Sequence, residues 1–158
     1  MKKLKLYLDT SVISYLSADD LPQQMSDTLK LWEEIKLGLY DIVISDVVIE
    51  EVMQCPQPKR DVLLKHLAQI DYFRDEISPE INELALQVIK LGVLKEKSRA
   101  DCLHIATAVV NQCDYILSWN FKHMVNVKTI KGVRAITNLC GYNNIDIIQP
   151  TMLVEKGD

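Results

Sequence analysis

Two carboxylates and one amide stand out because each lies where a predicted strand ends or a predicted helix begins. Asp9 directly follows an apolar segment, and Asn120 comes three residues after a second one. Asp101 lies in the first turn of the helix that leads into that second segment. Ligands of open parallel α/β sheets bind beyond the carboxyl ends of the strands. We therefore expect these side chains to meet at one edge of a sheet.

Glu51 joins this group because of its phase on a predicted helix. Successive helical residues are about 100° apart, and on this wheel Val48, Val52 and Cys55 form one apolar side. Glu51 falls on that inward side, whereas Glu50 falls on the outward side. A buried carboxylate without a partner is costly, so the position of Glu51 requires an explanation.

Each of these residues also has a local explanation that needs no ligand. Asp9 could cap the turn into the next helix, and Asn120 could simply end a strand. Asp101 lies three residues after Ser98, which is close to a capping-box pattern. Such local roles do not explain why the residues should converge, because neighbouring carboxylates repel one another unless a cation lies among them.

The chemistry of this group favours a divalent cation. Oxygen ligands without paired cysteines or histidines indicate Mg²⁺ or Mn²⁺ rather than zinc. Such an ion suits phosphodiester hydrolysis, because it activates a water, neutralises the phosphate and stabilises the leaving oxygen. The first hypothesis is therefore a metal-dependent phosphodiester hydrolase.

Further residues near the predicted site have two interpretations each. His104, one turn along the predicted helix, could bind metal, although such a histidine more often packs on the helix face. Trp119 could stack on a nucleobase or belong to the core. Arg99, Lys122 and His123 could contact nucleic-acid phosphates, or they could simply be solvated.

An alternation of strands and helices positions these residues. Apolar patterning predicts strands over residues 4–8, 40–44, 70–73, 115–117 and 144–149. Helical spacing with capping residues predicts helices over residues 10–16, 26–37, 45–55, 59–69, 78–92, 98–111 and 128–140. This order favours a single three-layer α/β/α domain with a central parallel sheet of about five strands, over residues 1–150, followed by a tail over residues 151–158.

Three of these helices have an apolar stripe that we expect to face the core. The inward residues are predicted to be Leu29, Trp32 and Ile35 in the first helix, Val62, Leu63 and Leu67 in the second, and Ile130, Val133, Ile136 and Leu139 in the third. We see no internal repeat and no shift of composition that would mark a second domain.

Composition limits the class of protein. The chain has 158 residues, 48% of them hydrophobic and 25% charged, which excludes disordered and low-complexity classes. A net charge of −4 argues against a protein that coats nucleic acid through a broad basic surface. The four cysteines show no CxxC spacing and the first apolar stretch stops at Asp9, so we expect no secretory signal and a reducing, cytoplasmic setting. No apolar run approaches the roughly 18 residues of a membrane helix.

Four segments in order resemble PIN-domain nucleases, specifically the VapC-like toxins of toxin–antitoxin pairs. The segments are LYLDTSV at 6–12, SDVVIEEV at 45–52, RADCLHIATA at 99–108 and ILSWNFKH at 116–123. Each segment alone is weakly specific, but four in this order span nearly the whole chain.

The resemblance implies a Mg²⁺- or Mn²⁺-dependent endoribonuclease with Asp9, Glu51 and Asp101 as metal ligands. Asn120 stands where many members carry a fourth Asp, and its amide can ligate but brings no charge. The hydroxyls that support the ligands correspond to Thr10, Ser11 and Ser118. The family also implies an RNA substrate, a homodimer and an antitoxin protein whose tail blocks the site.

Three other functions were weighed against this one. A non-catalytic module with the same fold, binding RNA or a protein partner, is the main alternative, because Asn120 lacks a charge. A phosphatase that uses an Asp-x-Asp pattern is disfavoured because Ser11 occupies the second acidic position. A nucleotide-binding Rossmann domain is weaker still, since no glycine-rich turn follows the first strand.

Overall fold

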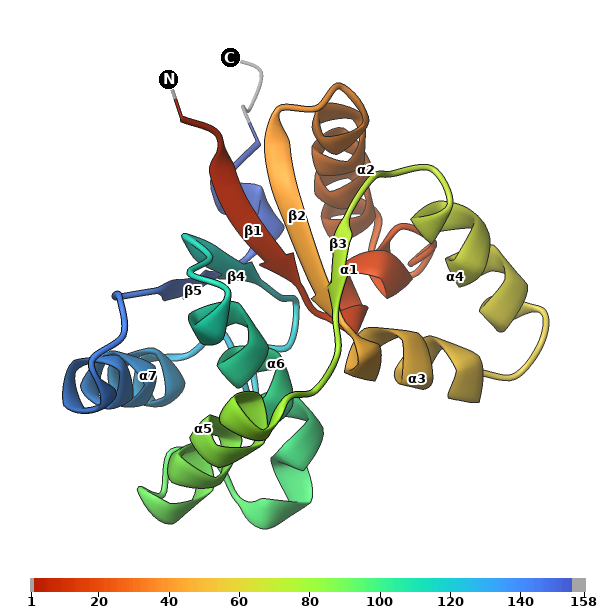
Figure 1. Ribbon diagram of the computed structural model, residues 1–158. Coiled ribbons are helices and arrows are strands. Elements are labelled where there is room, and N and C mark those ends of the chain that lie inside the picture. Colours follow the sequence, from red (N-terminus) through yellow and green to blue (C-terminus); the bar gives the residue numbers. More distant parts are fainter. Residues whose placement is uncertain (1, 155–158) are drawn as a thin grey trace.

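A five-stranded parallel sheet lies at the centre of the computed structural model, which describes residues 2–154 (Figure 1). The strands are β1 (Leu4–Leu8), β2 (Tyr40–Ser45), β3 (Phe73–Asp75), β4 (Tyr115–Leu117) and β5 (Asp146–Ile148). They follow the spatial order β3-β2-β1-β4-β5, and all four pairings are parallel. β1 is therefore the central strand.

Helices connect the strands and cover both faces of the sheet, which confirms the predicted three-layer class. The α-helices are α1 (Thr10–Tyr15), α2 (Pro22–Lys36), α3 (Asp46–Gln54), α4 (Lys59–Leu67), α5 (Pro79–Lys90), α6 (Arg99–Val110) and α7 (Val127–Cys140). Figure 1 shows α5, α6 and α7 grouped on one side of the sheet and α1 and α2 on the other. Two 3₁₀ turns, Glu96–Ser98 and Pro150–Met152, precede α6 and follow β5.

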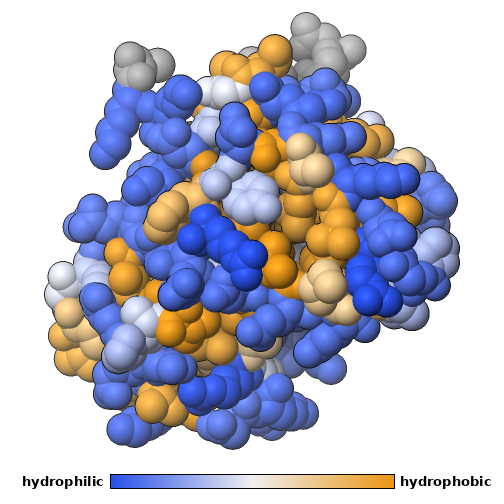
Figure 2. Space-filling model, turned by 45° about the vertical axis from the view of Figure 1, so that its right-hand side comes forward, coloured by the Kyte–Doolittle hydropathy of each residue, from blue (hydrophilic) through white to orange (hydrophobic). Residues whose placement is uncertain are grey.

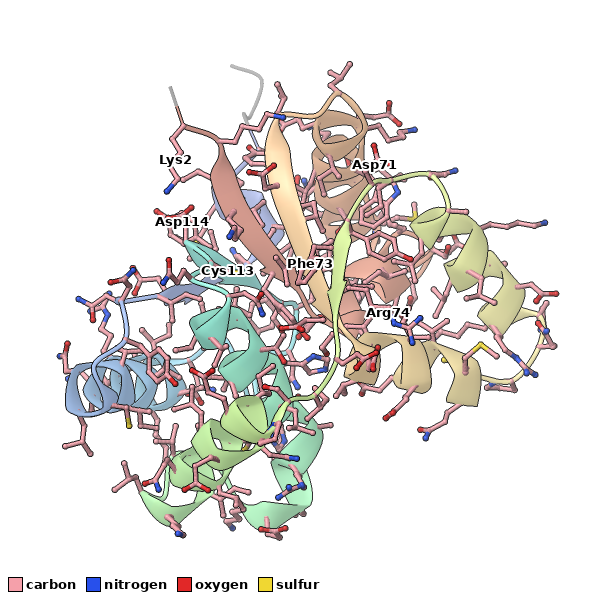
Figure 3. The ribbon with its side chains drawn as sticks, in the orientation of Figure 1. Lys2, Asp71, Phe73, Arg74, Cys113 and Asp114 are labelled. Carbon is pink, nitrogen blue, oxygen red and sulfur yellow. The ribbon has the colours of Figure 1, made fainter. Side chains whose placement is uncertain are left out.

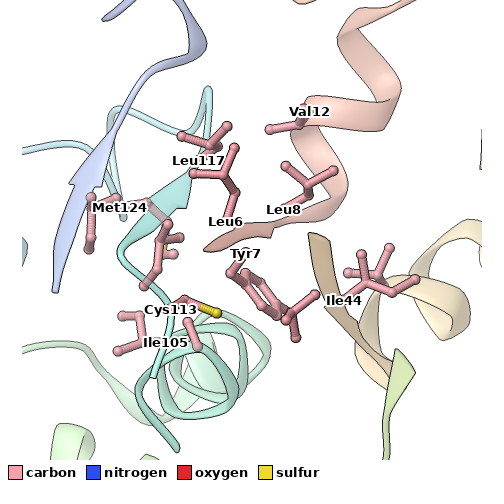
Figure 4. Close-up of a cluster of buried hydrophobic side chains, with 14 of the residues drawn as sticks. Leu6, Tyr7, Leu8, Val12, Ile44, Ile105, Cys113, Leu117 and Met124 are labelled. Carbon is pink, nitrogen blue, oxygen red and sulfur yellow. The ribbon is translucent and has the colours of Figure 1, made fainter. Parts of the chain in front are cut away.

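The central strand places its side chains on both faces, as a strand inside a parallel sheet must. Leu6 and Leu8 point to the α1 side, whereas Tyr7 points to the opposite side, toward α6 (Figure 4). All three side chains are fully buried. A strand buried on both faces holds the residue that follows it in a fixed position, and that residue is Asp9.

Side-chain contacts link β4 to β1 and β3 to α3. Figure 3 labels Asp114 and Arg74, which make these contacts. The carboxylate of Asp114, in the turn before β4, accepts a hydrogen bond from the backbone of Lys5 at 2.8 Å. Arg74 on the edge strand β3 forms an ion pair with Asp46 in the first turn of α3. These contacts fix β4 and β3 against the elements that carry the predicted site residues.

Helix α2 begins earlier than predicted. Its first residue is Pro22 and not Ser26, because the fixed φ of proline suits the first turn of a helix. Leu29, predicted to face the core, is 42% exposed, and Leu31 is buried in its place. The apolar residues of this helix are spread over more than one side, and tertiary packing decides which side is buried.

Two other helices also carry a predicted inward residue that is exposed, and one strand begins later than predicted. Val62 on α4 and Leu139 on α7 are exposed, although the helical spacing placed them inward. β3 covers residues 73–75 instead of 70–73, because its pairing with β2 starts at Phe73. Ile70, at the start of the predicted strand, is buried in the preceding loop.

Within residues 2–154, no helix is both long and apolar enough to cross a membrane. On the face turned toward β3 and α4, apolar side chains form a patch bordered by hydrophilic ones (Figure 2). The predicted tail over 151–158 begins inside the last 3₁₀ turn, and its residues 155–158 lie outside the described range.

Candidate active site

Asp9 lies at the carboxyl end of β1, where the strand order reverses between β2 on one side and β4 on the other. It is 3% exposed. Its Oδ1 accepts hydrogen bonds from the backbone and hydroxyl of Ser11, which makes it the N-cap of α1. Its Oδ2 accepts a hydrogen bond from the hydroxyl of Ser118, just after β4. Capping is therefore one role of Asp9, and it leaves a buried carboxylate at the edge of the sheet.

Glu51 on α3 faces the same edge. Its side chain is 38% exposed, whereas Glu50 points to solvent, as the helical phase predicted. Its Oε1 accepts hydrogen bonds from Thr10 Oγ1 at 2.8 Å and from His104 Nε2 at 2.7 Å. These contacts join α3 to α1 and α6.

Asp101 lies in the first turn of α6 with a side chain that is 22% exposed. The capping box with Ser98 does not form, because the Ser98 side chain caps nothing and its hydroxyl lies 3.0 Å from His123 Nδ1. Within residues 2–154, no hydrogen bond reaches the Asp101 carboxylate, and its basic neighbour is His123 Nδ1 at 3.8 Å. Asp101 is thus the carboxylate with the fewest partners.

The three carboxylates act on one another electrostatically. Burial raises the pKa of Asp9, against the opposing charge of His104 and the hydrogen bonds to the carboxylate. Burial also raises the pKa of Asp101, and the negative charges of Asp9 and Glu51 add to this effect. Burial disfavours the charge of Glu51, but its hydrogen bonds and the charge of His104 give a net lowering of its pKa. Each ionised carboxylate therefore makes this edge less favourable for the next.

Each hydroxyl predicted to support the carboxylates donates to one of them. Thr10 donates to Glu51, and Ser11 and Ser118 donate to Asp9. The oxygens of Ser11 and Ser118 also accept backbone N–H groups, at 2.9 and 3.0 Å, from the two residues that follow Ser118. The hydroxyls are therefore held in place from both sides.

Asn120 follows β4 and organises the next turn. Its Oδ1 accepts a hydrogen bond from the backbone of His123 at 3.0 Å. Its backbone carbonyl accepts hydrogen bonds from Met124 and Val125, both at 2.9 Å. The side chain is half-buried. Its observed contacts are those of a turn-forming residue.

His104 is not placed to bind metal, because both ring nitrogens already have hydrogen-bond partners and the side chain is 2% exposed. Its position behind Glu51 was not predicted. The only sequence signal for it was its place one turn after Asp101, on the same helix. Burial acts to lower the pKa of His104, but its hydrogen bond to Glu51 and the surrounding carboxylates give a net rise.

Trp119 requires a correction, because it belongs to the core. It is 3% exposed, its Nε1 donates to Thr28 Oγ1 at 2.9 Å, and its ring stacks on Tyr15. Phe121 packs edge-on against it. The ring is therefore not available to stack on a nucleobase.

The predicted phosphate-binding residues lie in two settings. Arg99 donates to Asn82 at 3.1 Å and lies 3.9 Å from Glu96, so its guanidinium is engaged locally. Lys122 and His123 line a cavity of about 210 Å³ beside Asp101. Three more lysines line it too, namely Lys95, Lys97 and Lys128. Within residues 2–154, none of the cavity's four lysines forms a salt bridge.

The donor set at this edge fits a hard divalent cation. The candidate ligands are the carboxylate oxygens of Asp9, Glu51 and Asp101, and the charges of Asp9 and Glu51 act on Asp101, whose basic neighbour is His123 Nδ1 at 3.8 Å. Within residues 2–154, no three acidic, His or Cys side chains already form a closed metal-binding group.

The family of the chain follows from its sequence match. The PIN domain family matches residues 6–121, from β1 to the turn after β4. The chain belongs to the PIN domain family. This confirms the family expected from the four segments of sequence. No curated protein sequence matches the chain.

Two solved structures of low sequence identity share this PIN fold. VapBC2 from Rickettsia felis, bound to a DNA fragment from its promoter, is 15% identical, with a TM-score of 0.56 over 92% of this chain and 98% of that one. VapC20 from Mycobacterium tuberculosis, described as a sarcin-ricin loop cleaving toxin, is 11% identical, with a TM-score of 0.57 over 89% of this chain and 98% of that one.

Proposed function

We propose that this PIN-domain protein is a Mg²⁺- or Mn²⁺-dependent endoribonuclease that hydrolyses RNA phosphodiester bonds. The observation that carries the proposal is that Asp9, Glu51 and Asp101 face one edge of the sheet, where within residues 2–154 no hydrogen bond reaches the Asp101 carboxylate. A group of carboxylates in this arrangement is stabilised by a cation. The name of VapC20 as a toxin that cleaves the sarcin-ricin loop supports RNA as the substrate class.

In this proposal Asp9, Glu51 and Asp101 hold the metal ion. The bound ion supplies a Lewis acid that activates water and neutralises the phosphate. Hydroxyl donors keep Asp9 and Glu51 in position. Asn120, at the margin of the site, contributes a neutral oxygen ligand or holds a water, and so completes the site without adding charge.

The RNA backbone is proposed to lie over the lysine-lined cavity beside Asp101. Lys122 and His123 belong to it, and Arg99 lies at the start of the helix that carries Asp101. Unpaired lysines are available to neutralise phosphates, and the cavity adjoins the carboxylate that would hold the metal. A short local contact of this kind is compatible with the net charge of −4.

A matched pair of variants tests the nuclease. Purified protein is incubated with end-labelled single-stranded and hairpin RNA in Mn²⁺, Mg²⁺ or EDTA, and products are resolved on sequencing gels. We expect cleavage with metal only, and we expect Glu51→Gln to lose at least about a thousand-fold in rate, since several kcal/mol of charge stabilisation disappear. Glu50→Gln, the exposed neighbour, should cleave as wild type does.

Full activity in EDTA, or wild-type activity of Glu51→Gln, would show that the carboxylate edge is not the catalytic centre. Products that carry a 3′-phosphate or a cyclic phosphate would also contradict the proposal, because hydrolysis by a metal-activated water leaves a 5′-phosphate in this proposal. The 5′ end is checked with an exonuclease that requires a 5′-phosphate.

The proposal also covers the partner, the oligomeric state and the cellular compartment of the protein. We propose that it is the toxin of a toxin–antitoxin pair, that it forms a homodimer and that it acts in the cytoplasm. The structural likeness to VapBC2 supports the first point, and four free cysteines are compatible with a reducing compartment. Co-expression with any small reading frame encoded next to its gene, followed by light scattering, would test the antitoxin and the dimer.

A catalytically impaired PIN module that binds RNA or a protein is the alternative. The uncharged Asn120, with its amide oxygen used in a turn, favours it. Calorimetric titration with Mn²⁺ distinguishes the two, because a protein that binds RNA but no Mn²⁺ fits only the alternative.

A further inference from the structure

A chain of hydrogen bonds crosses the core and ends on Glu51. The Val47 N–H donates to Ser45 Oγ at 3.2 Å, and Ser45 Oγ lies 2.8 Å from the Tyr7 hydroxyl. The Tyr7 hydroxyl lies 2.6 Å from His104 Nδ1. His104 Nε2 completes the chain, 2.7 Å from Glu51 Oε1. Ser45 and Tyr7 are fully buried and His104 nearly so.

The last bond of this chain has a fixed direction. An ionised carboxylate only accepts hydrogen bonds, so Nε2 of His104 carries the proton in its contact with Glu51. This is true of the imidazolium and of the neutral Nε2–H tautomer alike, so the contact does not depend on the protonation state of His104. In the neutral ring, Nδ1 accepts from Tyr7, and the Tyr7 oxygen accepts from Ser45.

This series of hydrogen bonds connects the three elements that position the carboxylates. Tyr7 lies two residues before Asp9 on β1, and it points from the strand toward α6 (Figure 4). His104 lies one turn after Asp101 on α6, and Ser45 is the N-cap of the helix that carries the third carboxylate. A contact that spans all three elements fixes their relative positions, and with them the spacing of the oxygens.

We infer that His104, oriented by Tyr7, is a positioning residue that presents Glu51 to the metal ion. It holds Oε1 together with Thr10, while within residues 2–154 no hydrogen bond uses Oε2. The inference rests on the proposed metal-dependent nuclease and concerns how the site holds one of its ligands. Removing a hydrogen-bond partner of a metal ligand typically lowers metal affinity or activity about 10- to 100-fold.

Three substitutions should weaken metal binding to different extents. His104→Leu removes the donor, His104→Gln places an amide N–H near the position of Nε2, and Tyr7→Phe removes only the hydroxyl. We expect His104→Leu to raise the Mn²⁺ dissociation constant, measured by calorimetry, about 10- to 100-fold. His104→Gln and Tyr7→Phe should have smaller effects, and kcat for RNA should fall more than KM changes.

A double-mutant cycle separates positioning from a general effect on the fold. In a Glu51→Ala background, His104→Leu should weaken Mn²⁺ binding no further, because the group that it positions is gone. Thr107→Val is the matched control, since Thr107 is fully buried on the same helix and donates only to the Leu103 carbonyl. Thr107→Val should lower thermal stability and leave Mn²⁺ affinity unchanged.

The imidazole ¹⁵N shifts of His104 give a readout without metal. Tyr7→Phe should change the Nδ1 shift while circular dichroism stays that of wild type, and this variant carries the test if His104→Leu does not fold. Wild-type Mn²⁺ affinity and kcat in folded His104→Leu, or in Tyr7→Phe with an altered Nδ1 shift, would overturn the inference and leave the nuclease intact. A wild-type protein that binds no Mn²⁺ would overturn both proposals.

Discussion

The two ends of the sheet differ in how far their charged side chains are exposed to solvent. At the amino ends of β1, β2 and β3 lies a cavity of about 670 Å³, lined by Lys3, Asp41 and Phe73 among others. These three side chains are exposed, and exposed charges are stabilised by water. At the carboxyl ends, Asp9 is buried and Asp101 is largely buried beside other carboxylates.

The larger cavity therefore lies at the amino ends, away from the buried Asp9 and the largely buried Asp101 at the carboxyl ends. The larger cavity collects charges that need no ligand. The carboxyl edge brings like charges together at a cost that a bound cation offsets. Functional chemistry is therefore expected at the end where the metal-free arrangement is least stable.

The largest expected effect comes from neutralising one aspartate at each end. Asp101→Asn should lower metal-dependent RNA cleavage at least about a thousand-fold, because a ligand charge is lost. Asp41→Asn, at the larger cavity, should cleave as wild type does. Initial rates in saturating Mn²⁺ check both variants, and equal losses in the two would remove the distinction between the ends.

A second pair of variants compares lysines at the two ends. Lys122→Ala combined with Lys128→Ala should weaken binding of a non-cleavable 2′-O-methyl RNA about tenfold, and should reduce the salt dependence by one or two phosphate contacts. Lys3→Ala combined with Lys36→Ala, at the larger cavity, removes the same charge. Fluorescence anisotropy at two salt concentrations measures both, and an equal loss in the two pairs would indicate only non-specific attraction.

The titratable groups at the carboxyl ends of the strands should also make the stability of the protein depend on pH. The raised pKa values of Asp9 and Asp101 mean that the fold favours their protonated forms, so this stabilisation is lost as pH rises through their folded-state pKa. His104, with a raised pKa, acts in the same direction above its ordinary value of 6.5. The lowered pKa of Glu51 acts in the opposite direction, but only below its ordinary value of 4.5. Above that value, the metal-free protein in EDTA should therefore become less stable toward mildly alkaline pH.

At mildly alkaline pH in EDTA, Asp101→Asn should raise Tm by roughly 2–4 °C, because it removes a charge from the carboxylate edge. Asp41→Asn should not. Calorimetric scans measure both, and Mn²⁺ should raise the Tm of wild type but not of Asp101→Asn. A lower Tm for Asp101→Asn would show that its carboxylate stabilises the metal-free fold.

The smallest expected effect is at Asn120. Asn120→Asp adds a charge at the margin of the site and should tighten Mn²⁺ binding about threefold, since one further carboxylate approaches the ion. Its turn should persist, because Asp can accept the same backbone N–H as the amide oxygen does. Calorimetry measures the affinity, and an unchanged affinity would place residue 120 outside the metal's surroundings.

Local periodicity predicted much of the fold. The alternation over residues 4–8 matches β1, and the helical phase around Glu51 turned it inward and Glu50 outward. Periodicity failed where a helix offers more than one apolar side, as Leu29 and Val62 show. It states which residues share a face, but packing decides which face is buried.

The residue types that follow the predicted strands were enough to predict an edge rich in carboxylates, and the resemblance to PIN-domain nucleases added the hydroxyls beside them. Only the tertiary structure decided what each side chain contacts. It buried Trp119 in the core and set His104 against Glu51, 53 positions away in the chain. The physical reason is that the spacing of residues in a helix or strand is fixed by local geometry, whereas partners so far apart are chosen by the packing of the whole domain.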